Sequence, residues 1–316
     1  MILAFGKPVH VQGEEGAYGF AERGPFSPLD VKLLTAAFVD GWIQGFYVEG
    51  GADLAPDAKL VVAVGTSNCG TDTRFRPANP RKACVPSERN VSINHGFAWA
   101  SLVDSIRRSL ELRLITRTVT VVGASDMQLA WNFPSVTNNW IDGYISYFDT
   151  ADVPAPPLVD FGSCEGCSYA NEDGSACTAP GCLEAPQSLR VVRSDGLTET
   201  MEWSWPLEEV LDKAWSSGVS RPIPEIYNKS GENARQWYGL SLYSVETGGR
   251  AVFFGGVLTQ CASESQPCAA RPDGNAPEAG WWQLYEWLKE NAATAQEDIP
   301  RLTLIDYILG LPCFDC

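Results

Sequence analysis

The sequence predicts an α/β protein, most simply a (β/α) barrel of the TIM type that is irregular or short of eight repeats. Short apolar runs rich in Val, Ile and Phe recur along the chain, and amphipathic stretches of helical length separate them. The 316 residues also fit one domain of this kind. An open doubly wound sheet is the second candidate, although no Gly-x-Gly-x-x-Gly motif follows the first apolar run to indicate a dinucleotide site.

Each predicted strand is a short apolar run that ends near Gly or a polar cluster, as expected for a parallel strand covered on both faces. These runs are residues 2–6, 60–65, 119–123, 158–162, 223–227 and 251–258, with a weaker one at 302–308. The helices predicted between them are residues 29–47, 97–114, 136–148, 207–215, 233–245 and 280–291. The alternation indicates right-handed βαβ units.

Local signals support this division. Ser27 before Pro28 is typical of a helix N-cap followed by proline at the first helical position. Residues 164–203 interrupt the alternation, and Ser194-Asp195-Gly196 between two β-prone runs predicts a hairpin there. We interpret this segment as an excursion on the barrel rim, so the prediction is a single domain over residues 1–316.

The net charge limits the partners. With 39 Asp and Glu against 23 Lys and Arg, the formal charge is −16. Phosphate recognition needs clustered Lys and Arg, so nucleic acid and anionic membrane surfaces are excluded as main partners. The chain contains no run of about 18 apolar residues, so the sequence predicts no membrane insertion. The oligomeric state is left open.

The ten cysteines favour disulfides and therefore an oxidising compartment. They fall into close pairs: Cys69/Cys84, Cys164/Cys167, Cys177/Cys182, Cys261/Cys268 and Cys313/Cys316. The two Cys-x-x-Cys pairs lie too far apart in the sequence for a zinc site, and acidic residues between their cysteines argue against a redox motif. We favour pairing of sequential neighbours, with other partners open for the two Cys-x-x-Cys pairs. We expect a secreted protein whose signal peptide is not part of these residues, because residues 1–6 are too short for one.

In a barrel, function lies where strands end, and three carboxylates stand there. Asp126 follows the run at 119–123, Asp160 lies in the run at 158–162, and Glu225 interrupts the apolar run at 223–227. Paired carboxylates at a barrel mouth are the chemistry of glycosidic bond cleavage. Asp126 and Glu225 are the best pair, with Asp160 third. The structural alternatives are that Asp126 caps the next helix and that Glu225 pairs with Arg221 or Arg235.

Aromatic and amide side chains near the strand ends indicate a sugar ligand. The chain has 11 Trp, and aromatic rings stack on sugar faces. The residues that we expect to bind substrate are Trp131, Tyr227, Trp203, Trp205, Gln128 and Gln260. His10 and His95 are the only histidines, and His95 is interpreted as a loop hydrogen-bond partner. The sequence therefore predicts neither a metal site nor a cofactor.

Several segments together resemble one family. They are GASDMQ (123–128), WIDGY (140–144), DFGSCEGC (160–167), PEIY (224–227), ARQW (234–237) and GVLTQ (256–260). As a set they resemble secreted bacterial proteins, frequent in actinobacteria, described as glycoside-hydrolase-like barrels. The resemblance covers residues 60–306 and implies the barrel fold and an extracellular location. Related lysozyme-like barrels carry Asp-x-Glu at the equivalent strand end, whereas this chain has Asp126-Met127-Gln128.

That departure leaves two functional expectations. A glutamine cannot transfer a proton as a carboxyl does. In the first hypothesis Glu225 supplies the acid/base, Asp126 is the nucleophile or orients water, Asp160 tunes both, and the protein hydrolyses a polysaccharide or cell-wall glycan. In the second, the same scaffold is a non-catalytic extracellular protein that binds glycan or self-assembles at a surface.

Overall fold

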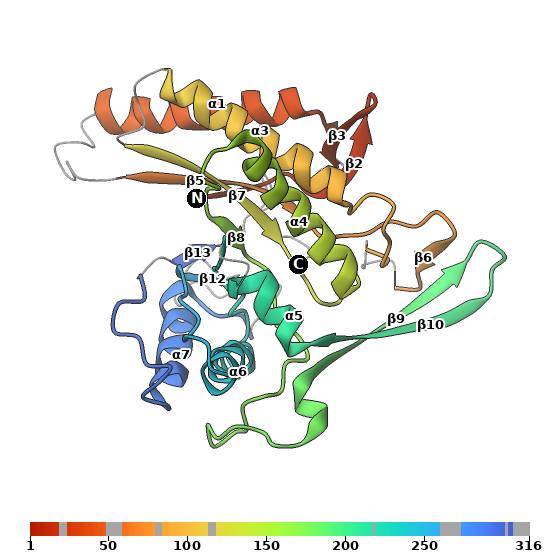
Figure 1. Ribbon diagram of the computed structural model, residues 1–316, viewed down its shortest axis with the longest axis vertical. Helices are drawn as coiled ribbons and strands as arrows, with labels where there is room; N and C mark the ends of the chain where they lie inside the picture. Colours follow the sequence, from red (N-terminus) through yellow and green to blue (C-terminus); the bar gives the residue numbers. More distant parts are fainter. Residues whose placement is uncertain are drawn as a thin grey trace.

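The computed structural model of the protein describes residues 1–18, 24–48, 59–79, 84–112, 118–216, 219–259, 273–300 and 303–305. Over these residues the chain is an α/β structure, which confirms the predicted class. Figure 1 shows parallel strands in the middle of the molecule, helices beside them, and a long hairpin that extends away from them. In this part of the chain, no helix is long and apolar enough to cross a bilayer.

Five parallel strands form the main sheet in the order β1-β5-β7-β8-β11. They are β1 (Ile2–Ala4), β5 (Leu60–Ser67), β7 (Val119–Asp126), β8 (Leu158–Asp160) and β11 (Ser220–Pro222). A parallel bridge from Glu225 to Leu258 leads on to the parallel pair β12 (Val257–Thr259) and β13 (Thr303–Ile305). Within the five-stranded sheet, the spatial order of the strands follows their order in the sequence. In a doubly wound sheet this order reverses at one point, and no such reversal occurs within these five strands.

The predicted strand at 223–227 is where the ladder changes. The strand β11 ends at Pro222, and Glu225 pairs only as an isolated bridge. Proline has no N–H to donate, so Pro222 and Pro224 break the ladder around this point. The chain still runs beside its neighbours, because Ile226 N donates to Leu258 O at 2.9 Å.

All six predicted helices are present, with ends that differ by a few residues. They are α1 (Pro28–Ile43), α3 (Ile93–Glu111), α4 (Pro134–Ala151), α5 (Leu207–Leu211), α6 (Glu232–Glu246) and α7 (Pro277–Lys289). Short π-helical turns η1 (Gln44–Val48) and η3 (Asp212–Ser216) follow α1 and α5. The predicted cap of α1 is confirmed, since Ser27 Oγ accepts from Asp30 N at 3.2 Å and Ser27 N donates to Asp30 Oδ2 at 2.8 Å.

Alternate side chains of the central strands pack on opposite faces. Val62, Val64 and Val121 belong to a large core cluster that also contains helix residues of α3 and α4. The other face holds a smaller buried cluster: Ala63, Val122, Ala124, Val159, Phe161, Ile223 and Leu258. These members come from strands and from the residues directly after strands. A second large cluster packs α5, α6 and α7 around Trp237 and Leu284.

Two antiparallel units are attached to the strands. The first was not predicted and follows β1: β2 (Lys7–Val11), β3 (Glu14–Tyr18) and β4 (Pro25–Phe26). The second is the predicted hairpin, in which the 3₁₀ turn η2 (Pro180–Leu183) leads into β9 (Glu184–Arg193), paired with β10 (Thr198–Pro206). Its turn contains Gly196 at φ +87°, a conformation that favours glycine. The short strand β6 (Phe75–Pro77) pairs with the other edge of β9, and Figure 1 shows it beside the hairpin.

Three of the predicted disulfides are confirmed. They are Cys69–Cys84, Cys164–Cys167 and Cys177–Cys182, each between sequential neighbours. Cys261, Cys268, Cys313 and Cys316 lie outside the described residues. The first two bonds follow directly on strands β5 and β8, so they restrain loops at the carboxyl ends of those strands.

The helices α3 and α4 approach each other backbone to backbone through two glycines. A Cβ atom on Gly96 would lie 1.9 Å from Trp140 O, and one on Gly143 would lie 2.0 Å from Ile93 O. Neither carbonyl can move away without breaking its own helix. The crossing therefore requires glycine at both positions.

His95 lies within this contact and not in a loop as predicted, because α3 begins at Ile93. Trp140 Nε1 donates to His95 Nδ1 at 2.9 Å, so the ring proton is on Nε2, which donates to Gly16 O at 2.9 Å. Burial lowers the pKa of His95 from 6.5 to about 4. His95 is thus a neutral hydrogen-bonding core residue.

Replacing Gly96 or Gly143 by alanine should destabilise the protein by about 3 kcal/mol, near the upper end of ordinary overpacking costs. The added methyl group meets a backbone carbonyl in each case. Gly41→Ala in α1 is the control, because no atom lies within 4 Å of its Cβ position, and it should be neutral or stabilising by up to about 1 kcal/mol. Urea unfolding measures the free energy of unfolding of all three variants. If Gly96→Ala were as stable as the wild type, the close crossing of α3 and α4 would be contradicted.

His95 should make the fold acid-sensitive well above the range of the carboxylates. Below pH 6.5 the unfolded chain binds a proton that folded His95 binds only near pH 4, so stability is full above pH 6.5 and falls between these values. At pH 5 the loss should be about 2 kcal/mol. Urea unfolding at pH 7 and pH 5 should show a smaller pH effect in His95→Gln than in wild type. The exposed His10→Gln variant should keep the wild-type effect, and an equal effect in all three proteins would exclude His95 as its source.

Candidate functional site

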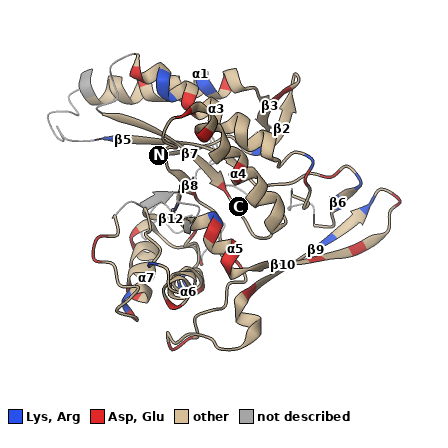
Figure 2. Ribbon diagram, viewed as in Figure 1, with Lys and Arg blue, Asp and Glu red and all other residues tan. Residues whose placement is uncertain are grey.

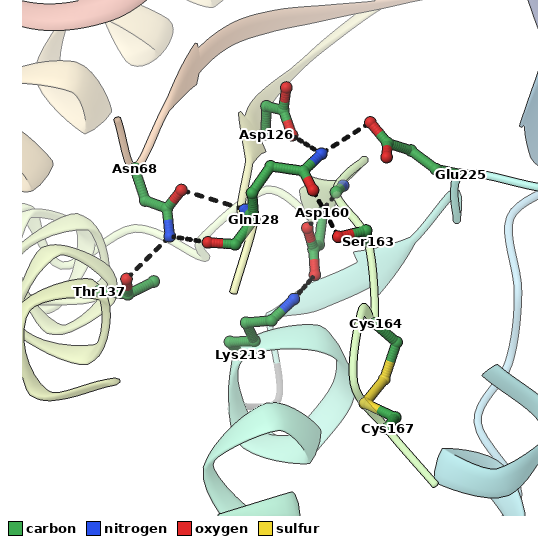
Figure 3. A network of polar contacts seen from close by, with 11 residues as sticks. Asn68, Asp126, Gln128, Thr137, Asp160, Ser163, Cys164, Cys167, Lys213 and Glu225 are labelled. Carbon is green, nitrogen blue, oxygen red and sulfur yellow. Dashed lines mark hydrogen bonds and ion pairs between the residues drawn. A yellow bond between two sulfur atoms is a disulfide. The ribbon is translucent and has the colours of Figure 1, made fainter. Parts of the chain in front are cut away.

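The candidate site lies at the edge where the parallel strands end. Asn68 follows β5, Asp126 ends β7, and Ser163 follows β8. Glu225 stands beside β12 through its bridge to Leu258. Because parallel strands place their carboxyl ends at one edge, residues far apart in the sequence meet there, as expected. Figure 3 shows them around the side chain of Gln128.

Gln128 is the centre of this network. Its Nε2 donates to Asp126 Oδ1 at 2.8 Å and to Glu225 Oε1 at 2.7 Å. Its Oε1 accepts a hydrogen bond from Ser163 Oγ. The hydroxyl donor on one side and two carboxylate acceptors on the other set the orientation of the amide. Gln128 thus brings together the two carboxylates that the sequence analysis paired.

The backbone of Gln128 is held by Asn68. Gln128 N donates to Asn68 Oδ1 at 3.1 Å, and Asn68 Nδ2 donates to Gln128 O at 3.0 Å. The second hydrogen of the Asn68 amide goes to Thr137 Oγ1 in α4, also at 3.0 Å. All three residues are buried. Their bonds fix Gln128 at both its main chain and its side chain.

Glu225 is buried, with 9% of its surface exposed, and it is held by neighbours at the same edge. Besides Gln128, Tyr227 donates its hydroxyl to Glu225 Oε1 at 2.9 Å. The two arginines considered as partners are engaged elsewhere. Arg221 lies over the ring of Trp215, and Arg235 donates to Ala170 O at 3.1 Å. The Gln128 amide and the Tyr227 phenol therefore help to hold Glu225 in place.

Asp160 is the third predicted carboxylate, and its contacts differ in kind. Its Oδ2 lies 2.8 Å from Lys213 Nζ, and both side chains are completely buried. Its Oδ1 accepts from Gly162 N at 3.0 Å. Lys213 is on η3 and also lies over the ring of Trp237. Figure 3 shows Asp160 beside Ser163, with Lys213 farther from the two site carboxylates. Asp160 therefore supports the strand end that carries Ser163.

The predicted substrate-binding aromatics lie in different environments. Trp205 is completely buried, and its Nε1 donates to Leu129 O and Asn132 O, so its ring belongs to the core. Trp203 is half-buried and donates to the same Leu129 carbonyl at 3.0 Å. Trp131 and Tyr227 are also half-buried. Gln260 lies outside the described residues.

The structure adds residues that the sequence analysis did not single out, namely Asn68, Thr137, Ser163 and Lys213. Ser163 and Asn68 share a signal that could have identified them, because each is polar and stands at the end of a buried strand. Lys213 lies among buried apolar residues of α5 and η3, which follow β10, and an isolated lysine there signals a buried counter-charge. In the described part of the chain, no group of three or more His, Cys, Asp or Glu side chains is placed to hold a metal ion.

Comparison of the chain with protein-family models, with curated proteins and with solved structures finds no match. The chemistry of this site therefore has to be argued from its own geometry.

Replacing Gln128 by glutamate should destabilise the protein at neutral pH by about 1–3 kcal/mol, the cost of unsatisfied buried groups. The variant loses the N–H donor between Asp126 and Glu225 and adds a third carboxylate beside them. Like charges raise the pKa of the added carboxyl, so the destabilisation should shrink as the pH falls and the group binds a proton.

Urea unfolding at pH 7 and pH 4.5 measures this difference between Gln128→Glu and wild type. Gln44→Glu is the control, since Gln44 is exposed and a surface change should stay within about 0.5 kcal/mol. A variant as stable as wild type at pH 7 would contradict the bridging role of the Gln128 amide.

Proposed function

We propose that this protein is a secreted glycoside hydrolase on a (β/α) barrel, with Glu225 as acid/base and Asp126 as nucleophile. The observation that carries the proposal is the bridge by Gln128. One amide nitrogen contacts a carboxylate oxygen of each residue, so two acids from different strand ends stand together at one edge. The three disulfides support an oxidising, extracellular location.

Two features support a barrel. Neighbouring strands follow each other in the sequence from β1 to β11, and the Glu225–Leu258 bridge continues this order to β12. Strand residues such as Ala63, Val122 and Val159 fill the face opposite the helices. A barrel interior is packed in this way, by side chains of the strands themselves.

The spacing of the two carboxylates favours a retaining mechanism. Asp126 Oδ1 lies 2.8 Å and Glu225 Oε1 lies 2.7 Å from Gln128 Nε2, so the two oxygens can be no further apart than the sum of these distances. Retaining enzymes hold their carboxyl groups about 5–5.5 Å apart, whereas inverting enzymes need about 6.5–9.5 Å to admit a water molecule. The upper limit set by the bridge falls in the retaining range.

The roles follow from the surroundings of each acid. Glu225 is the more buried and takes the part of the acid, which must enter the reaction with a proton. It protonates the glycosidic oxygen as that bond breaks, while Asp126 forms a covalent bond to the anomeric carbon. Glu225 then removes a proton from water, whose oxygen attacks the same carbon and releases Asp126. Gln128 and Tyr227 hold the two acids in place through donated hydrogen bonds.

Glu225→Gln and Asp126→Asn should each lower glycan hydrolysis by at least about a hundredfold, because general acid–base and nucleophilic groups contribute on this scale. Both replacements keep the shape of the side chain. Release of reducing ends from a panel of bacterial and plant polysaccharides measures the effect. Glu232→Gln, an exposed change at the start of α6, should keep wild-type activity.

The alternative is a glycan-binding or self-assembling protein on the same scaffold. Gln128 favours it, because it occupies the position where the resembled barrels carry a glutamate. Trp282 in α7 is 38% exposed beside the buried Trp281 and offers an apolar surface for assembly. If folded wild-type protein releases no reducing ends from any polysaccharide, the hydrolase proposal fails and binding becomes the function to test.

A further inference from the structure

The structure also contains a cavity of about 500 Å³, whose lining residues are separate from those of the candidate site. One wall comes from the loop after β5, at Arg74, Phe75 and Arg89. Phe133, directly before α4, and Met201 on the hairpin strand β10 also line the cavity. The Cys69–Cys84 disulfide closes the loop that carries Arg74 and Phe75. We call this cavity the Arg89 pocket.

The Arg89 pocket is joined to the candidate site by a short chain of buried hydrogen bonds. Ser87, which lines the pocket, donates its N–H to Asn132 Oδ1 at 3.0 Å. Asn132 Nδ2 donates to Asn68 O at 3.1 Å, and Asn68 in turn holds the backbone of Gln128. Asn132 is completely buried. The pocket and the site therefore share one rigid support at the same end of the strands.

The charges that line the pocket cancel. Asp72 and Glu88 face Arg74 and Arg89, so the lining is formally neutral in a protein of charge −16. Arg74 binds Asp72 through Nη2 at 2.7 Å and Nε at 3.1 Å. Figure 2 shows both signs of charge along the hairpin formed by β9 and β10. A neutral lining gives no attraction for a polyanion.

The side chains of the pocket suit a sugar. Arg89 donates to Thr73 Oγ1 at 2.9 Å through Nη1, and its guanidinium has further N–H donors for hydroxyl groups. The carboxylate of Glu88 supplies an acceptor. The ring of Phe133 is held edge-on by Trp203, with centroids 5.7 Å apart, and provides the apolar surface on which a sugar ring packs.

We propose that the Arg89 pocket is a subsite for a neutral saccharide, and that it binds the glycan chain whose glycosidic bond lies at Asp126 and Glu225. Only the second part of this inference, that the bound glycan chain reaches Asp126 and Glu225, rests on the proposed function. Binding in the pocket needs neither carboxylate. Ligand sites of this kind commonly have volumes of about 300–1,000 Å³, and the pocket falls within that range.

Calorimetric titration of the oxidised protein tests the subsite, with Glu225→Gln as the background so that no ligand is consumed. The probes are chitotriose in its N-acetylated form, cellotriose and xylotriose, with trigalacturonate as the charged comparison. At least one neutral trisaccharide should bind, and Arg89→Ala should weaken it by about tenfold or more, the scale of a lost charged hydrogen bond. Phe133→Leu should also weaken it, whereas the exposed Arg250→Ala should not.

The proposal is overturned if no neutral trisaccharide binds, if trigalacturonate alone binds, or if both pocket variants bind like the background protein. Arg89 is exposed, so its replacement leaves a folded protein to measure. The two proposals fail separately. Binding that depends on Arg89 in a protein without hydrolytic activity would retain the subsite and remove the hydrolase. Hydrolysis by a protein that binds none of the trisaccharides would retain the hydrolase and remove the subsite.

Discussion

The buried ion pair between Asp160 and Lys213 is the interaction on which the arrangement of the candidate site depends. Two fully buried charges are tolerated only while they face each other, because removal of either leaves an uncompensated charge that costs about 3–5 kcal/mol. The pair joins the end of β8 to η3. It thereby fixes the residues that follow β8, including Ser163, whose hydroxyl orients the Gln128 amide. The ion pair therefore supports, without touching either site carboxylate, the serine that orients the amide between them.

The site is also a product of strand register. Asp126 pairs with Ser67 across β7 and β5, and Ser125 pairs with Asp160 across β7 and β8. A shift of one residue in either ladder would turn these side chains to the opposite face. The long apolar runs of β5 and β7 resist such a shift because both faces of each strand are buried. Packing of the strands therefore supplies the precision that the polar network needs.

Much of this could be predicted from the sequence, because periodicity reports burial directly. The helices, most of the parallel strands, three cysteine pairs and the meeting of Asp126 with Glu225 follow from patterns within single segments and from the rule that parallel strands end together. The strands predicted at 223–227 and 251–258 are wrong over most of their length, because the first is an isolated bridge and the second begins only at Val257. The β2–β3–β4 sheet was missed, since its tight turn at Gln12 and Gly13, both at positive φ, lacks the usual Asn-Gly or Asp-Gly signal. The central place of Gln128, the burial of Trp205 and the partner of Asp160 could not be predicted, because each depends on which segments meet across the fold.

The Cys69–Cys84 bond has a practical consequence for anyone who prepares this protein. It closes a loop with a sequence separation of 15, which corresponds to about 3 kcal/mol of restricted chain freedom in the unfolded state. That loop carries Arg74 and Phe75 of the Arg89 pocket, whereas Arg89 itself lies outside the loop. In material made in a reducing cytoplasm, this part of the lining would be held by the pairing of β6 with β9 and by contacts such as that of Thr71 with Asn90. The choice of expression compartment therefore affects how firmly this part of the Arg89 pocket is held in the purified sample.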